Sequence, residues 1–294
     1  MRLGLNGGFP VRHVSDVTPA FAQSLRALDV RGLRLDVTAG PGESVFETTT
    51  PAYHQVRNVL ADAGIRVVHT GGGAQRLIAA DESERRQAAR VLAEACRAAG
   101  ALGAQAVLTG CGSADPRGAY VAHPYNWSQQ AFDQLVQSLR EVAVAAEANG
   151  VQIALEPHQL TTLSGPRRTR ELIEATGSAA VRLNLDIVNW VTLETYFDTP
   201  RLITEAIAEI GAVTISAHLK DVVLEPRLVT HIDERLPGEG TLDWVVWLRA
   251  LDQLLPEDGY ALLDHASIDK APAAFGYIRR IAAEAGVRWT EAAA

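Results

Sequence analysis

"SQQAFDQLVQSLREVAVAAEANGVQIALE", residues 128–156, contains one helical pattern followed directly by one strand pattern. Ser128 is a residue type that caps helix N-termini, and Asn149-Gly150 is typical of a helix end. Between these limits the apolar residues recur at helical spacing and share one face: Phe132, Leu135, Val136, Leu139 and Val142. The β-branched run 151–156 then predicts a buried strand. The stretch therefore predicts an amphipathic helix that returns the chain to a sheet.

The same unit recurs along the chain. Eight short runs rich in β-branched residues cover 2–6, 30–37, 64–70, 104–110, 151–156, 181–186, 212–219 and 260–265, with helical patterns between them. Eight such units without a linker predict an α/β fold, a single (β/α)8 TIM barrel over residues 1–294, with a flexible tail at 289–294. The alternative is a doubly wound open sheet, but "LNGGFPVRH" (5–13) lacks the G-x-G-x-x-G spacing of its phosphate turn.

Composition narrows the function classes. A net charge of −8 disfavours nucleic acid as a partner, and the cluster Arg167, Arg168 and Arg170 fits a solvated helix start better than a phosphate clamp. No long uncharged apolar run predicts a membrane span, and "MRLGLNGGFP" does not fit a signal peptide, so we expect a cytoplasmic protein. Cys96 and Cys111 are too few for a disulfide framework, and we expect a buried thiol at Cys96.

Polar side chains stand at the ends of the last four predicted strands. The motifs "ALEPH", "LNLDIVN", "SAHLKD" and "LLDH" contain Glu156, Asp186, His218 and Asp264. Strand C-terminal ends surround the active site of a (β/α)8 barrel, so we expect these side chains to converge. Each alone is also compatible with a helix cap or a core residue, but three partly buried carboxylates together require a cation. Such a donor set suits Mn²⁺, Mg²⁺, Co²⁺ or Zn²⁺.

The order of these motifs, with "PGEG" (237–240) between the last two, resembles the xylose isomerase-like TIM-barrel superfamily in its sugar phosphate isomerase/epimerase branch. The resemblance covers nearly the whole chain and is strongest over residues 121–288. It implies that the four strand-end residues bind one divalent metal ion, most often Mn²⁺. It also implies an isomerase or epimerase that acts on a sugar or keto-sugar through an enediolate, and a homodimer.

The resemblance also implies roles for individual residues. Glu156 would remove the substrate proton and Asp264 would return it from the other face. Two departures from the family pattern concern this site. Most relatives have glutamate where this chain has Asp264, so Asp264 has less reach and His265 is a second candidate ligand. Ketose 3-epimerases have a substrate-contacting histidine at the position of Asn189, and an amide cannot carry a proton.

Further side chains are expected at the barrel mouth. His69, His158 and Lys220 end or follow predicted strands, and Lys220 is suited to stabilise an enolate oxygen, although an ion pair with Asp221 is the alternative. The long loop 112–130 predicts a lid or a sugar-stacking wall, with substrate contacts from His123, Asn126 and Trp127. A second long loop, 225–244, contributes two weaker candidates, His231 and Glu239.

Three other functions compete with an isomerase. A leaving group beside the enolate leads to β-elimination, so a lyase or deglycosidase acting on a 3-keto-glycoside, or a dehydratase, is the first alternative. Endonuclease IV shares the barrel, but its three metals and basic surface do not match one metal set and a charge of −8. A non-catalytic sugar-binding or partner subunit is the third alternative. We expect a substrate without phosphate, because no glycine-rich turn follows "LLDHAS" (262–267).

Overall fold

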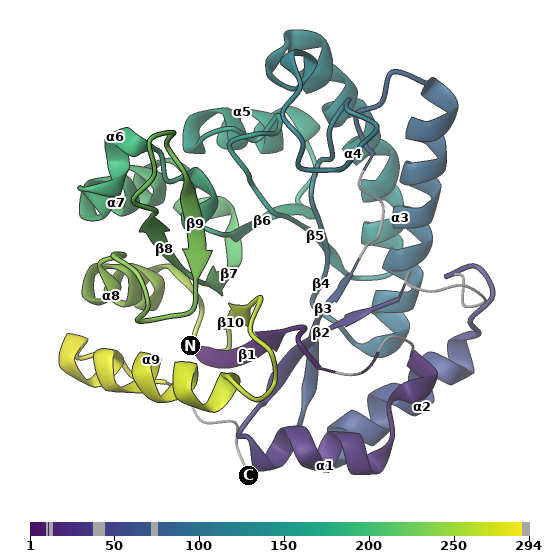
Figure 1. Cartoon of the computed structure of the whole chain (residues 1–294). Coiled ribbons are helices and arrows are strands. Elements are labelled where there is room, and N and C mark those ends of the chain that lie inside the picture. The colour runs from purple at the N-terminus through teal and green to yellow at the C-terminus, as the bar shows by residue number, and fades with distance from the viewer. Residues whose placement is uncertain (10, 12–13, 38–44, 72–75, 290–294) are drawn as a thin grey trace.

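Eight parallel strands close into a barrel in the order β1-β10-β7-β6-β5-β4-β3-β2 in the computed structural model (Figure 1). The strands are β1 Arg2–Asn6, β2 Gly32–Asp36, β3 Arg66–Gly71, β4 Ala106–Thr109, β5 Gln152–Leu155, β6 Val181–Leu185, β7 Thr214–Leu219 and β10 Tyr260–Asp264. Each lies within one of the eight predicted runs or extends it by one residue, so the predicted TIM barrel is confirmed. The structure describes residues 1–9, 11, 14–37, 45–71 and 76–289, and the predicted flexible tail beyond residue 289 lies outside them.

Helices follow the strands and surround the barrel (Figure 1). They are α1 Pro19–Ala27, α2 Thr50–Asp62, α3 Glu82–Leu102, α4 Gln129–Ala148, α5 Pro166–Thr176, α6 Leu193–Tyr196, α7 Thr199–Ile210, α8 Trp244–Leu254 and α9 Ala271–Ala285. The predicted limits of α4 are confirmed: the Ser128 hydroxyl accepts a hydrogen bond from the Ala131 amide, and Asn149 ends the helix. Leu33 and Leu35 of β2 are buried in the same apolar cluster as Leu60 of α2, so the core lies between barrel and helices.

A two-stranded antiparallel sheet stands apart from the barrel, beside β7 (Figure 1). It consists of β8 Asp221–Leu224 and β9 Ile232–Arg235, so half of it lies in a segment predicted to be a loop. This hairpin was not predicted from the sequence, because its strands have four residues each and mix charged with β-branched residues. Because β8 and β9 pair in register, their residues hold fixed positions relative to each other between β7 and α8.

No helix in the described ranges is both long enough and apolar enough to cross a membrane.

Candidate metal centre

Four side chains meet at the C-terminal ends of four neighbouring barrel strands. Glu156 follows β5, Asp186 follows β6, His218 lies on β7 and Asp264 ends β10. One nitrogen or oxygen atom from each of these residues lies within 4.8 Å of the corresponding atoms of the other three. The barrel therefore brings together all four residues that the sequence predicted as metal ligands, and it does so at the rim where barrel enzymes place their chemistry.

The imidazole of His218 stands at the centre of the cluster. Its Nδ1 lies 3.1 Å from Glu156 Oε1 and 3.5 Å from both Asp186 Oδ2 and Asp264 Oδ2. Asp264 therefore reaches the cluster in spite of its short side chain. The Asn6 amide donates a 2.5 Å hydrogen bond to the other oxygen, Asp264 Oδ1, and so fixes the orientation of this carboxylate.

Lys220 occupies the same cluster rather than pairing with Asp221. Its Nζ lies 2.7 Å from Asp186 Oδ2 and 3.2 Å from Asp264 Oδ2, and its side chain is 3% exposed. Asp221 accepts four hydrogen bonds instead, from the amides of Val222, Gly238 and Leu242 and from the Trp244 indole. The local ion pair considered from the sequence is therefore absent between these two described residues, and Asp221 anchors the hairpin and the loop after it.

The carboxylates of the cluster favour positive charge on the groups among them. Burial alone would lower the pKa of His218, but the Asp264 and Glu156 carboxylates outweigh burial and raise it to about 10. Burial would likewise raise the pKa of Asp186, and the nearby Lys220 ammonium instead lowers it. In the metal-free chain both His218 and Lys220 are therefore cationic at neutral pH, and together they leave one of the three carboxylate charges uncompensated.

The donor set fits a divalent ion. Three carboxylates and one imidazole are ligands for Mn²⁺, Mg²⁺, Co²⁺ or Zn²⁺, and their donor atoms are already within 4.8 Å of one another. With His218 neutral, the two positive charges of the ion and the single charge of Lys220 would balance the three carboxylates. Glu156, Asp186, His218 and Asp264 are thus the residues that would hold the ion.

Two predicted site residues lie beside Glu156: Asn189, expected to bind substrate, and His158, expected to take part in catalysis. Asn189 Nδ2 stands 3.4 Å from Glu156 Oε1, and its Oδ1 is 3.5 Å from Lys220 Nζ. The ring of His158 packs against Tyr120 with their centroids 5.4 Å apart, and burial lowers the pKa of His158. The Tyr120 hydroxyl lies 3.4 Å from Glu156 Oε2. These groups therefore lie around the Glu156 carboxylate.

His265 lies beside the cluster but faces a different partner. Its Nδ1 is 2.6 Å from Glu234 Oε1, and its Nε2 is 3.7 Å from Asp264 Oδ2. The backbone of His265 has φ of 50°, a left-handed conformation that turns the chain immediately after Asp264. The hydrogen bond that the His265 ring donates to Glu234 raises the pKa of His265, despite the opposing effect of burial.

His69 is part of a hydrogen-bonded layer inside the barrel. Its Nε2 is 3.0 Å from Ser216 Oγ, and Ser216 Oγ donates to Asn184 Oδ1 over 2.8 Å. Because the Ser216 proton is used on Asn184, the Nε2 of His69 must carry the proton that it shares with Ser216. Complete burial, reinforced by His218 and Arg34, lowers the pKa of His69 to about 3 and keeps the ring neutral.

The predicted contacts of the loop 112–130 make their hydrogen bonds within loops. His123 Nδ1 accepts a bond from the Tyr125 amide, and the buried Asn126 amide donates to Ser113 and to the Leu160 carbonyl. The Trp127 indole donates to the Gln159 carbonyl while 43% of the residue stays exposed. Asn126 thus ties the loop that follows β4 to the loop that follows β5.

Of the candidates in 225–244, His231 pairs with Asp233 over 2.9 Å, away from the cluster. Glu239 lines a cavity of about 170 Å³ at the metal centre, together with Lys220, Glu234, Arg235, Leu236, Asp264 and His265.

Sequence reasoning missed three polar residues at this centre. Asn6 ends β1, so the rule that strand ends carry the chemistry would have found it. Tyr120 lies in a loop that was predicted to line the mouth, where no local signal distinguishes it from its neighbours. Glu234 reaches the centre only because β9 pairs with β8, and the hairpin itself was not predicted.

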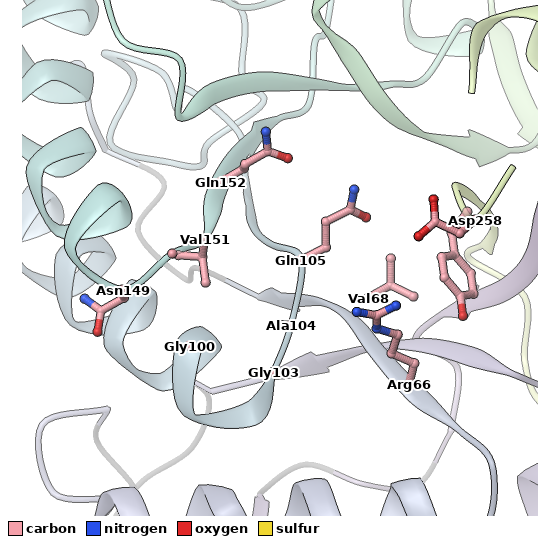
Figure 2. Close-up of a pocket in the computed structure, with 12 residues that line it drawn as sticks. Arg66, Val68, Gly100, Gly103, Ala104, Gln105, Asn149, Val151, Gln152 and Asp258 are labelled. Carbon is pink, nitrogen blue, oxygen red and sulfur yellow. The ribbon is translucent and has the colours of Figure 1, made fainter. Parts of the chain in front are cut away.

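A larger cavity, of about 580 Å³, lies at the opposite end of the barrel. Figure 2 shows Arg66, Gln105, Gln152 and Asp258 around it. Arg66 and Gln152 are the first residues of their strands, so this cavity is at the N-terminal ends, remote from the cluster of Glu156, Asp186, His218 and Asp264. We therefore place the candidate site by the convergence of ionisable groups and not by the size of the cavity.

Comparisons with known proteins agree with this architecture. The family described as "Xylose isomerase-like TIM barrel" matches residues 23–287. A magnesium complex of such a protein from Mycobacterium smegmatis has a TM-score of 0.71 and 17% identity, covering 97% of this chain and 96% of that one. D-psicose 3-epimerase from Clostridium cellulolyticum H10, in complex with D-tagatose, has a TM-score of 0.71 and 15% identity, covering 96% of this chain and 99% of that one. 3-Keto-D-glucoside 4-epimerase from E. coli has a TM-score of 0.69 and 14% identity, covering 95% of this chain and 99% of that one. No curated protein sequence matches significantly.

Proposed function

Because this chain belongs to the xylose isomerase-like TIM barrel family, we propose that it is a divalent-metal-dependent isomerase or epimerase of a sugar or keto-sugar. The observation that carries the proposal is the cluster of Glu156, Asp186, His218 and Asp264 at the C-terminal rim of the barrel. Two structures of similar fold are epimerases of sugars, and a third is a complex with magnesium. Mn²⁺ is the ion that we propose, with Mg²⁺, Co²⁺ and Zn²⁺ as alternatives that the same donors accept.

The chemistry needs a base, an acid and positive charge. A divalent ion bound at the cluster would supply a Lewis acid beside the substrate oxygens, which lowers the free energy of an enediolate. Glu156 takes the proton from the carbon next to the carbonyl, with Tyr120 and Asn189 orienting its carboxylate. Asp264, oriented by Asn6, would carry a proton of its own in the substrate complex and donate it to the opposite face, becoming a carboxylate as Glu156 becomes an acid. β6 and β7 separate its strand from that of Glu156, so the two carboxylates approach from different sides.

Lys220 and His158 complete the proposed machinery. The Lys220 ammonium, between the cluster and the 170 Å³ cavity, faces the position where negative charge develops on a substrate oxygen. His158 would contact a substrate hydroxyl as a neutral ring, since burial lowers its pKa. His69 is completely buried and pairs with Ser216 of β7, so we assign it a structural role and not a substrate contact.

Solvent deuterium exchange tests the proposal. The Mn²⁺-loaded protein would be incubated in D₂O with D-fructose, D-psicose, D-tagatose and a 3-keto-D-glucoside, and the sugars followed by NMR. We expect deuterium at the carbon next to the carbonyl and its loss in Glu156→Gln, with metal content retained. Exchange that continues undiminished in the metal-loaded Glu156→Gln protein would show that Glu156 is not the base.

The runner-up is a metal-dependent lyase or deglycosidase that cleaves a 3-keto-glycoside, or a dehydratase. Asn189 favours it, because an amide that touches Glu156 cannot relay the proton that a histidine could. Release of an aglycone from a 3-keto-glycoside supports this reaction, whereas reversible interconversion without fragments supports the isomerase. Location in the cytoplasm and dimerisation stay predictions, which cell fractionation and light scattering would test.

A further inference from the structure

Lys220 binds the same oxygen atoms that a metal ion would need. Asp186 Oδ2 and Asp264 Oδ2 each lie 3.5 Å from His218 Nδ1, and both are also the oxygens that face Lys220 Nζ. A cation that entered among the four ligands would therefore meet a second cation bound to two of its own ligands. Unless another anion shares Lys220, the lysine weakens metal binding through competition for these oxygens and through like-charge repulsion.

Glu234 is that additional anion. Its Oε2 lies 3.3 Å from Lys220 Nζ, on the side of the small cavity, and its Oε1 lies 2.6 Å from His265 Nδ1. Glu234 is 46% exposed as a side chain, whereas Asp186 and Asp264 are each 1% exposed. Lys220 is thus shared between two buried carboxylates inside the barrel and one carboxylate at its mouth.

The position of Glu234 is fixed from outside the barrel. In the hairpin β8–β9, Glu234 pairs in register with Val222, two residues after Lys220. Asp221, between them, accepts hydrogen bonds from the Leu242 amide and the Trp244 indole, which hold the start of β8 against the segment that leads into α8. The hairpin therefore holds the Glu234 carboxylate in a fixed position beside Lys220, on the side of the barrel mouth.

We propose that Glu234 is a positioning residue that draws the Lys220 ammonium toward the mouth of the barrel, so that Lys220 and a divalent ion can share one site. Lys220 then serves as a second cation, aimed at the substrate pocket, while Asp186 and Asp264 are left for the ion. The inference rests on the proposed metal-dependent function and adds the hairpin β8–β9 to the site.

A double-mutant cycle on metal affinity tests the inference without any substrate. Mn²⁺ binding would be measured by calorimetry and by electron paramagnetic resonance for the unaltered chain, Glu234→Gln, Lys220→Met and the double variant. Asp233→Asn is the matched control, because it removes the same charge from the neighbouring position of β9, where the partners are His231 and Arg235 rather than Lys220. Thermal unfolding of each metal-free variant verifies that it is folded.

We expect Lys220→Met to bind Mn²⁺ about ten-fold more tightly or better, because a competing cation is removed. Glu234→Gln should bind it several-fold more weakly while Lys220 is present and within about two-fold of its parent when Lys220 is methionine. Asp233→Asn should stay within about two-fold of the unaltered chain. An equal loss from Glu234→Gln in both backgrounds would overturn the inference, as would weaker binding by Lys220→Met.

The outcomes separate this inference from the proposed function. If the unaltered chain binds no Mn²⁺, the metal-dependent function and the inference both fail. If Mn²⁺ binds and the cycle shows the expected coupling, but no sugar exchanges deuterium, the isomerase proposal fails and the role of Glu234 stands.

Discussion

Replacing Asp221 with alanine tests whether the hairpin is anchored as the structure indicates. The carboxylate is completely buried, and its two oxygens accept four hydrogen bonds of 2.8 to 3.0 Å. Three of the donors belong to the buried residues Val222, Leu242 and Trp244, whereas the fourth belongs to Gly238 at the surface, where water can replace the carboxylate. Alanine would leave the three buried donors without a partner.

The magnitude follows from these three donors. An unpaired buried donor costs about 1–3 kcal/mol, so we expect Asp221→Ala to lower the free energy of unfolding by roughly 4–6 kcal/mol. For a chain of this length that corresponds to a melting temperature lower by about 8–12 °C, at roughly 2 °C per kcal/mol. Asp221→Asn should lose about half as much, since one acceptor oxygen remains.

Differential scanning calorimetry and urea unfolding, both on the metal-free protein, would measure these changes. Asp252→Ala, on the exposed face of α8, is the matched control and should change stability by less than about 0.5 kcal/mol. A loss below about 2 kcal/mol for Asp221→Ala would refute the reasoning, because it would mean that the four donors find other partners or are not buried.

The remaining predictions concern the metal, two backbone positions and the thiols. Protein purified without added metal should carry about one divalent ion per chain by elemental analysis, and Asp186→Ala should lose this ion while keeping its far-UV circular dichroism. A metal-free native protein, or an Asp186→Ala variant that keeps the ion, would contradict the prediction. Ser128→Ala should cost about 1 kcal/mol in urea unfolding, because the amide of Ala131 loses its cap, and no change would argue against that cap. Gly8→Ala should cost at least about 2 kcal/mol, since a Cβ would stand 1.8 Å from the Ala266 carbonyl oxygen at φ of +80°; unchanged thermal unfolding would contradict this close approach. Burial raises the pKa of Cys96 to about 12 and also raises that of Cys111, so a thiol reagent at pH 8 should react with the denatured chain and hardly with the native one.

The sequence by itself determined the barrel and the four residues that we propose as metal ligands. Strand and helix periodicities are local properties, so the runs could be located one by one, and their number left one common architecture. Parallel strands of a closed barrel end at one rim, so the residues at strand ends, Glu156, Asp186, His218 and Asp264, had to meet there. The family resemblance pointed to the same four positions.

Only the tertiary structure decided which groups surround these ligands. Lys220 pairs with Asp186 and Asp264 rather than with its neighbour Asp221, because each partner is set by the direction in which a strand presents its side chains. Glu234 reaches Lys220 through the register of a hairpin whose short strands carry little periodic signal. Strand ends converge by geometry alone, whereas contacts from loops and hairpins depend on pairings between residues that no local pattern records.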